Sequence, residues 1–597
     1  MKTKVERKKK KAKKKLSPQE KAVLKEQKSQ RAEISSILKN IGFFRLPYID
    51  GKHFQYDGKK TEMDDIFIYK NVILIVEYTI GTPGEHLLMK NYFYNKVNSD
   101  KRAFIDFLLE EEKLNSFKSY YEEHIKGTYT KNQLILKTLY CSKQAISDDH
   151  KCLANDDIAF FDYHIVKYFS SLTKVIKRTS KFEFLDFLRI PHKSVGDNLN
   201  NSSKSSTDTF SGHILPEEKS SFKEGYKIVS FYIDAESLLK RAYVFRQSGW
   251  RDVENVGHYQ RMLVSKKINS MRKYLSEKDR VFINNIISSI ATDKIKLYDS
   301  KGNELKLNSN GQFLGENSIE VMPASIEIND ECNIIGIIDG QHRTFAYHEG
   351  DDQYEKTISK QRKIQNLLVT GILFPSGEPV QKRINFEANL FLEINSNQTN
   401  ASSQLKQEIE LMLSPFSSVA IAKKILQGLN KSGPLGNLIE QYWYETGKIK
   451  TASIVSYGLR PLIKIEDVKA KDSIYAIWDN SSKHKLKTKD EENFDLLEQY
   501  VNFCVEKIRD IFIAFKASIP NERWHTYAPN VPQGVLTVTF INGVLNVLRL
   551  LIESGKISSI EDYKIKLTHV SEFDFRAYKS SQYRKMGEDI FNKYFAN

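Results

Sequence analysis

Residues 334–350, IIGIIDGQHRTFAYHEG, join an apolar run to a helical pattern through a short polar corner. The first five residues are β-branched or glycine, which is typical of a buried strand, and residues 344–348 have the character of a helix start. Backbone N–H groups at a helix N-terminus favour an anion, so the corner predicts a phosphate site in which Arg343 donates two parallel hydrogen bonds. The alternative is an ordinary strand-turn-helix connection in which Arg343 pairs with a core carboxylate.

Residues 339–343 spell DGQHR, and two further stretches accompany this motif. Residues 259–261, YQR, precede a helical pattern at 266–275 and a strand-like run at 281–290. Residues 391–398, FLEINSNQ, follow the motif. Three motifs in this order resemble the DGQHR-domain (DndB-like) family, a branch of the ParB/sulfiredoxin superfamily, over about residues 227–410.

The resemblance implies a nucleotide site that binds ATP or another nucleoside triphosphate, with Mg²⁺. Its implied nucleotide-binding residues are Gly340, Gln341, His342, Arg343, Arg261, Asn395 and Gln398, and its implied catalytic residues are Asp339, Gln341, His342 and Arg343. Gln341 stands where sulfiredoxin has a reactive cysteine, so thiol-based repair of sulfinic acids is excluded. Asp339 beside a bound phosphate would need Mg²⁺ to be tolerated.

Residues 61–79, TEMDDIFIYKNVILIVEYT, predict a hairpin with strands at 66–69 and 72–76. Asp64 and Asp65 precede the first strand and Glu77 ends the second, so these three carboxylates could converge on one divalent metal. The layout resembles the PD-(D/E)xK restriction-endonuclease-like fold, in which an Asp and a later Glu-x-Lys form the site.

The match to that motif is incomplete, because Thr79 occupies the lysine position. Lys90, on a helix expected at about 85–97, could supply the missing cation, which makes Asp65, Glu77 and Lys90 the candidate catalytic residues. Three alternatives stay open: an active nuclease, an inactive fold that only binds DNA, and solvated carboxylates at the ends of a hairpin.

The length and composition of the chain indicate its domain organisation. A chain of 597 residues is too long for one core. Residues 1–15 contain ten basic residues against Glu6 alone, so nine of the sixteen net positive charges lie in a tail that either binds polyphosphate or only keeps the chain soluble. Ser17 and Pro18 predict the start of a helix that runs to about residue 39. No apolar run is long enough to span a bilayer, and no signal peptide is expected, so the predicted location is the cytoplasm with no membrane partner.

The predicted fold class is therefore a multidomain α/β protein. The expected parts are a basic tail and helix start (1–30), a restriction-endonuclease-like module (31–190), a polar linker (191–225), a ParB/sulfiredoxin-like DGQHR module (226–410) and a mostly α C-terminal lobe (411–597).

The DGQHR resemblance implies a bacterial protein of DNA modification, such as phosphorothioation, of restriction-modification or of phage defence. The first expectation is a protein that binds and hydrolyses a nucleoside triphosphate and acts on DNA, modified or not, with other modification or defence proteins as candidate partners. Two alternatives are a DndB-like transcriptional regulator or DNA-binding adaptor without turnover, and a Mg²⁺-dependent endonuclease that uses the DGQHR module as a sensor.

Overall fold

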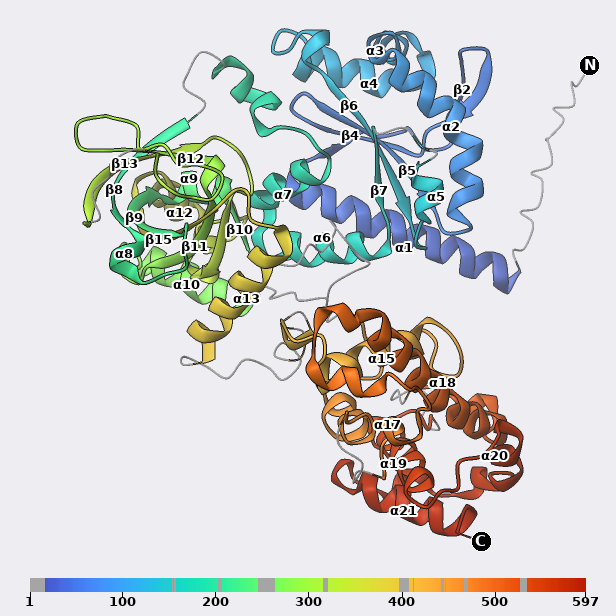
Figure 1. Ribbon diagram of the computed structural model, residues 1–597. Coiled ribbons are helices and arrows are strands. Elements are labelled where there is room, and N and C mark those ends of the chain that lie inside the picture. Colours follow the sequence, from blue (N-terminus) through green and yellow to red (C-terminus); the bar gives the residue numbers. More distant parts are fainter. Residues whose placement is uncertain are drawn as a thin grey trace, which may run out of the picture. The chain divides into compact units, whose positions relative to one another are not determined.

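The computed structural model describes residues 17–152, 154, 157–201, 207–244, 263–314, 320–396, 407, 409–411, 413–441, 445, 447–465, 471–526 and 534–596. The chain forms two compact units (Figure 1). The first comprises Met1–Val244 with Met262–Glu378, and the second comprises Phe245–Arg261 with Pro379–Asn597. Sheets with flanking helices make up the first unit, which confirms the predicted α/β class.

The first sheet of this unit contains five strands in the order β1-β4-β5-β6-β7. They are β1 (Phe44–Arg45), β4 (Asp65–Tyr69), β5 (Val72–Thr79), β6 (Ile135–Ser142) and β7 (Ile158–Phe161). Strands β4 and β5 pair antiparallel, which confirms the predicted hairpin, while β5, β6 and β7 run parallel. All eight residues of β5 are buried, because helices cover both faces of the sheet.

Helices α2 (Pro83–Ser99), α3 (Lys101–Glu110) and α4 (Asn115–Tyr120) share one hydrophobic cluster with the isoleucines of β4 and β5. Helix α1 (Pro18–Ile41) and helix α6 (Tyr163–Ile176) run side by side (Figure 1). The start of α1 is confirmed at Ser17, whose hydroxyl accepts from the backbone of Glu20 while the Glu20 carboxylate accepts from the backbone of Ser17.

The second sheet of the first unit has eight strands in the order β10-β14-β11-β15-β9-β8-β13-β12. Its strands are β8 (Thr207–Leu215), β9 (Lys227–Asp234), β10 (Ala242–Val244), β11 (Ile286–Ala291), β12 (Ile295–Tyr298), β13 (Met322–Asn329), β14 (Ile335–Asp339) and β15 (Asn366–Phe374). The DGQHR corner follows β14 directly. Nearby helices are α9 (Ala235–Arg241), α10 (Ser265–Lys278), α11 (Gln341–Phe345) and α12 (Glu355–Ile364).

Three predicted boundaries differ from the structure. Strand β8 lies inside the segment 191–225 that was expected to be a linker, and it pairs with both β9 and β13. Its polar residues suit a sheet in which alternate side chains face outward. The first unit ends at Glu378, so residues 379–410 of the expected DGQHR module belong to the second unit. The helix after the corner begins at Gln341, three residues earlier than predicted.

The described part of the second unit is helical, which confirms the mostly α lobe, and it contains no strand. Its main helices are α13 (Val380–Ser396), α15 (Ser418–Lys431), α18 (Phe494–Ser518), α19 (Val538–Glu553), α20 (Ile560–Lys566) and α21 (Tyr583–Tyr594). Buried faces of α15, α18 and α19 form its core. Within the described ranges, no helix has both the length and the apolar character needed to cross a membrane.

Candidate functional site

Two carboxylates face each other across the hairpin of the first sheet. Asp65 is the register partner of Val76, so Asp64, one residue earlier, lies opposite Glu77, one residue later. Because side chains alternate between the two faces of a sheet, Asp64 and Glu77 share one face. Asp65 points to the other face, where it accepts a hydrogen bond of 3.0 Å from the Tyr78 hydroxyl.

Lys90 of α2 supplies a cation to this carboxylate pair. Its Nζ lies 3.2 and 3.3 Å from the two carboxylate oxygens of Glu77 and donates to the carbonyl oxygen of Glu62 at 2.8 Å. Thr79, two residues after Glu77 on the same strand, occupies the position where the PD-(D/E)xK motif has its lysine. Strand β5 therefore has no lysine at this position, and α2 supplies Lys90 to Glu77 instead.

Asp64 is held by two groups that sequence reasoning missed or did not use. Arg31 of α1 forms an ion pair of 2.7 Å with Asp64 and a second one of 2.5 Å with Asp50. The backbone N–H of Tyr78 donates to Asp64 at 2.9 Å. The signal for Arg31 was weak, because an arginine within a polar helix usually faces solvent.

Burial controls the charge of Glu77, whose side chain is 1% exposed. Desolvation raises its pKa to about 8, the ion pair with Lys90 opposes this shift, and the nearby charge of Asp64 adds to it. A buried carboxylate that shares its site with a second carboxylate is the kind of group that a bound cation stabilises.

The predicted metal set of Asp64, Asp65 and Glu77 needs correction. Arg45 binds both oxygens of Asp65 at 2.7 and 2.8 Å on the opposite face from Glu77, so Asp65 is a structural ion-pair partner. The described residues contain no group of three or more His, Cys, Asp or Glu side chains placed to hold a metal. The pair of Asp64 and Glu77 still suits Mg²⁺, which is commonly bound by one or two carboxylates with water and substrate phosphates.

The DGQHR corner is built around a glycine. Gly340 has φ of 89°, and a Cβ there would lie 2.5 Å from Cδ1 of Ile286. An L side chain is therefore excluded by both conformation and space. Arg343 donates to the carbonyl oxygen of Asn285 at 2.9 Å and to the Asp339 carboxylate at 3.1 Å. The ion pair of Arg343 with Asp339 matches the predicted alternative to a phosphate site, in which Arg343 pairs with a carboxylate. Here the carboxylate belongs to the DGQHR motif itself.

Other polar atoms at the corner have no partner among the residues that the structure describes. Gln341 is 3% exposed, and within the described ranges both its amide nitrogen and its amide oxygen lack a hydrogen-bond partner, as do Nε of Arg343 and the hydroxyl of Thr344. Leaving such groups buried and unpaired costs about 1–3 kcal/mol each. His342 is engaged, because its Nε2 accepts from the backbone N–H of Val264 at 3.0 Å.

The remaining nucleotide-binding predictions are Arg261, Asn395 and Gln398. Arg261 and Gln398 lie outside the described residues, and Asn395 belongs to α13 in the second unit. These three assignments stay predictions.

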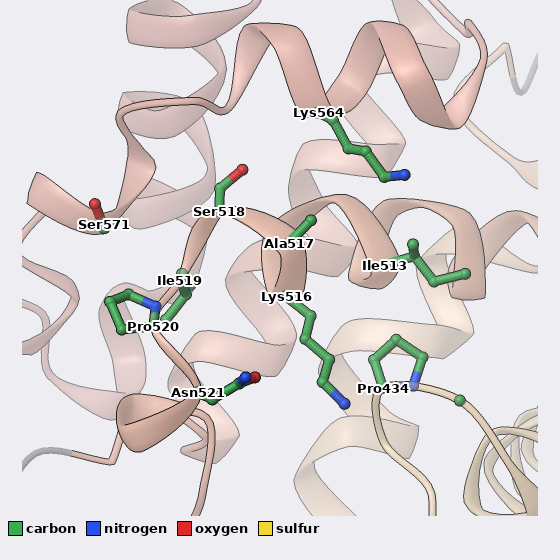
Figure 2. A pocket seen from close by; sticks show the side chains of 11 residues that line it. Pro434, Ile513, Lys516, Ala517, Ser518, Ile519, Pro520, Asn521, Lys564 and Ser571 are labelled. Carbon is green, nitrogen blue, oxygen red and sulfur yellow. The ribbon is translucent and has the colours of Figure 1, made fainter.

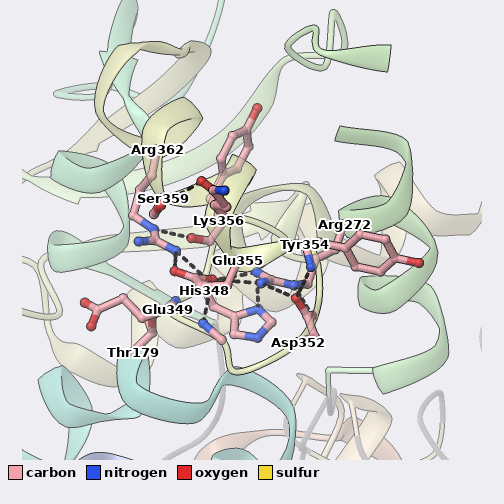
Figure 3. A network of polar contacts seen from close by, with 12 residues as sticks. Thr179, Arg272, His348, Glu349, Asp352, Tyr354, Glu355, Lys356, Ser359 and Arg362 are labelled. Atoms are coloured by element: carbon pink, nitrogen blue, oxygen red, sulfur yellow. Dashed lines mark hydrogen bonds and ion pairs between the residues drawn. The ribbon is translucent and has the colours of Figure 1, made fainter. Parts of the chain in front are cut away.

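Two buried arginines hold the chain that follows the corner (Figure 3). Arg272 is fully buried and binds Asp352 at 2.6 and 3.0 Å, Glu355 at 2.8 Å and the carbonyl oxygen of His348 at 2.8 Å. Arg362 binds the other carboxylate oxygen of Glu355 at 2.8 Å and the same His348 carbonyl. The sequence signal for Arg272 was its place on the apolar stripe of the predicted helix at 266–275, where a free charge would not be tolerated.

The second unit has an open cavity of about 840 Å³ at the C-terminal end of α18 (Figure 2). Its charged lining residues are Lys516 and Lys564, and no predicted site residue lines it. The cavity is therefore separate from the two candidate sites of the first unit.

A scan against protein-family models gave no match, and searches of curated proteins and of solved structures gave none either.

Proposed function

We propose that the first unit is a Mg²⁺-dependent phosphodiesterase that cleaves DNA, in a modification-associated or defence role. The proposal rests on one observation: Lys90 contacts both carboxylate oxygens of Glu77 on the sheet face that Glu77 shares with Asp64. Two carboxylates and one lysine form the set that the resemblance to PD-(D/E)xK enzymes requires, with the lysine coming from a helix.

Each residue of this set has a distinct role in the proposed reaction. Asp64 and Glu77 would hold Mg²⁺, which when bound supplies Lewis acidity and a more acidic water. Lys90 lowers the pKa of Glu77 and places a positive charge where negative charge develops on the phosphate. Arg31 and the Tyr78 N–H orient Asp64 and act as positioning groups.

A cleavage assay tests this function. The parent protein is incubated with modified and unmodified plasmid DNA, with Mg²⁺ or with a chelator. Substitution of Lys90→Met should reduce Mg²⁺-dependent cleavage by about 10²–10³-fold. Lys96→Met on the same helix is the matched control, because Lys96 binds the exposed Asp57 and not the carboxylate pair. No cleavage of any DNA by the parent, or full cleavage by the Lys90 variant, would overturn the proposal.

Binding and hydrolysis of a nucleoside triphosphate at the DGQHR corner is a second candidate function, favoured by the Gln341 amide, which has no hydrogen-bond partner in the described part of the chain. In Arg343, Nη2 serves both Asp339 and the Asn285 carbonyl, whereas Nε has no hydrogen-bond partner among the described residues and is a donor that a phosphate could accept from. Phosphate release from ATP, GTP and CTP, with and without DNA, should be lost in Arg343→Ala. If the protein neither cleaves DNA nor releases phosphate but binds DNA with strong salt dependence, the regulator or adaptor function is favoured instead.

A further inference from the structure

His86 lies on the side of α2 that faces the carboxylate pair. His86 and Lys90 are four residues apart on this helix, so their side chains are neighbours on one helix face. Lys90 contacts both carboxylate oxygens of Glu77 on β5. The helix face that carries His86 therefore lies over the sheet face that carries Asp64 and Glu77.

Tyr140 of β6 connects His86 to the same sheet face. It is the register partner of Glu77 in the parallel pair of β5 and β6, so the two side chains point to the same side of the sheet. Asp64, Glu77 and Tyr140 thus form one row across three neighbouring strands. Nδ1 of His86 lies 2.9 Å from the hydroxyl oxygen of Tyr140, which places His86 beside this row.

The contacts of Tyr140 determine which nitrogen of His86 carries the hydrogen. The buried Tyr140 hydroxyl also donates to the carbonyl oxygen of Pro83 at 2.9 Å, and a hydroxyl has only one hydrogen to donate. If Nδ1 had no hydrogen, it would compete with the Pro83 carbonyl for that one. With a hydrogen on Nδ1, both contacts are hydrogen bonds, because Nδ1 donates to the hydroxyl oxygen. This tautomer leaves the lone pair of the ring on Nε2.

The Nε2 atom of His86 is available to a substrate. Within the described ranges it has no hydrogen-bond partner, and His86 is only half-buried. Burial lowers the pKa of His86 and the charge of Lys90 lowers it further, whereas the carboxylates of Asp64 and of Glu62, the last residue of β3 (Lys59–Glu62), act in the opposite direction. The ring is therefore neutral at neutral pH, and the two carboxylates favour the imidazolium that forms when it accepts a proton.

We propose that His86 is the general base of DNA cleavage and that its Nε2 accepts a proton from the attacking water, an inference that rests on the proposed function. The water oxygen forms a bond to phosphorus while one of its O–H bonds breaks and that proton moves to Nε2. The P–O bond to the leaving deoxyribose oxygen breaks, and this oxygen keeps the electron pair and takes a proton from solvent. The imidazolium then releases its proton to solvent. Tyr140 is a positioning residue, because it holds Nδ1 and touches no reacting atom.

Steady-state cleavage of a DNA duplex by the full chain with Mg²⁺ tests this role. His86→Gln should lower kcat by about 10²–10³-fold and leave KM nearly unchanged, since a general base acts on the chemical step. The ratio of the parent kcat to the variant kcat should shrink as the pH is lowered from about 8 to about 5, because a protonated His86 cannot accept a proton. Added imidazole should restore part of the cleavage by His86→Ala. A purely structural role would produce neither the pH dependence nor the rescue.

His150 on α5 (Asp148–Cys152) provides the matched control. Its ring packs against Gly84 of the same helix and its Nδ1 contacts the hydroxyl of Ser147, so His150→Gln removes a histidine beside α2 that has no contact with the row. This variant should keep the kcat and the pH profile of the parent. Tyr140→Phe should lower kcat less than His86→Gln does, because Nδ1 loses its acceptor while Nε2 remains.

The outcomes separate this inference from the proposed function. A pH-dependent loss in His86→Gln, with imidazole rescue of His86→Ala, supports it. Cleavage by His86→Gln at the parent rate, a loss with neither pH dependence nor rescue, or an equal loss in His150→Gln overturns it. In each of these three cases the proposed function stands if the parent cleaves DNA and Lys90→Met does not. A parent that cleaves no DNA overturns both. The melting temperature of each variant shows whether it is folded.

Discussion

Substitution of Glu77→Gln should change how the stability of the first unit depends on pH. The pKa of Glu77 is raised from its ordinary value of 4.5 to about 8 in the folded protein, so between these values the folded state holds a proton that the unfolded state has released. The free energy of unfolding must then fall as the pH rises through this window. Glutamine has no such proton and removes this dependence.

The size of the effect follows from the two pKa values. Each pKa unit corresponds to about 1.4 kcal/mol, and integration from about pH 5 to about pH 8.5 assigns roughly 4 kcal/mol of lost stability to Glu77. The parent should therefore lose roughly this much more than Glu77→Gln over the same range. Near pH 5 the two proteins should differ little, because a protonated Glu and a Gln have nearly the same shape.

The assay must report on the first unit alone. All four tryptophans, Trp250, Trp443, Trp478 and Trp524, belong to the second unit, so tryptophan fluorescence is unsuitable. Urea unfolding at each pH, followed by pulsed hydrogen exchange of peptides from β5 and β6, isolates the sheet that carries Glu77. Glu110→Gln, at an exposed position on α3, is the control. Parallel pH profiles for the parent and Glu77→Gln would refute the burial of an ionisable Glu77.

Four further substitutions test the geometry. Asp64→Asn should abolish Mg²⁺-dependent DNA cleavage while Asp65→Asn leaves it largely intact, and equal loss in both variants would contradict their placement on opposite faces. Gly340→Ala should lower the free energy of unfolding of the first unit by about 1–3 kcal/mol because of its φ of 89° and the contact with Ile286, so unchanged hydrogen exchange around β14 would argue against this corner geometry. Arg272→Met should lower the free energy of unfolding of the first unit by about 1–3 kcal/mol, because the buried carbonyl of His348 and the partly exposed Asp352 lose hydrogen bonds, and a melting temperature equal to that of the parent would show that these contacts of Arg272 are not needed.

Local features could be predicted from the sequence because they depend on residues close together in the chain. The capping box at Ser17, the β4–β5 hairpin around Lys70 and the strand before Gly340 each follow from turn chemistry or from the spacing of apolar residues. The two-residue period of a strand also implies that Asp64 and Asp65 point to opposite faces of the sheet. The predicted metal site of Asp64, Asp65 and Glu77 did not take this into account.

Strand β8 shows what such patterns cannot determine. Its polar sequence is typical of a linker, and it becomes a strand because β9 and β13 lie on either side of it and satisfy its backbone hydrogen bonds. Its partner strand β13 is about a hundred residues away in the sequence, so the strand conformation of β8 depends on pairing across the sheet.

The candidate sites depend on tertiary structure in the same way. The residue types in the sequence were enough to predict Glu77, Lys90 and Arg343 as candidates. Lys90 reaches Glu77 only because α2 packs against the sheet. In the same way, only the fold places Asp339 and the Asn285 carbonyl beside Arg343. The burial of Arg272 likewise follows from the carboxylates and carbonyls that surround it. Charge and burial are properties of a side chain's surroundings, and those surroundings come from segments far apart in the sequence.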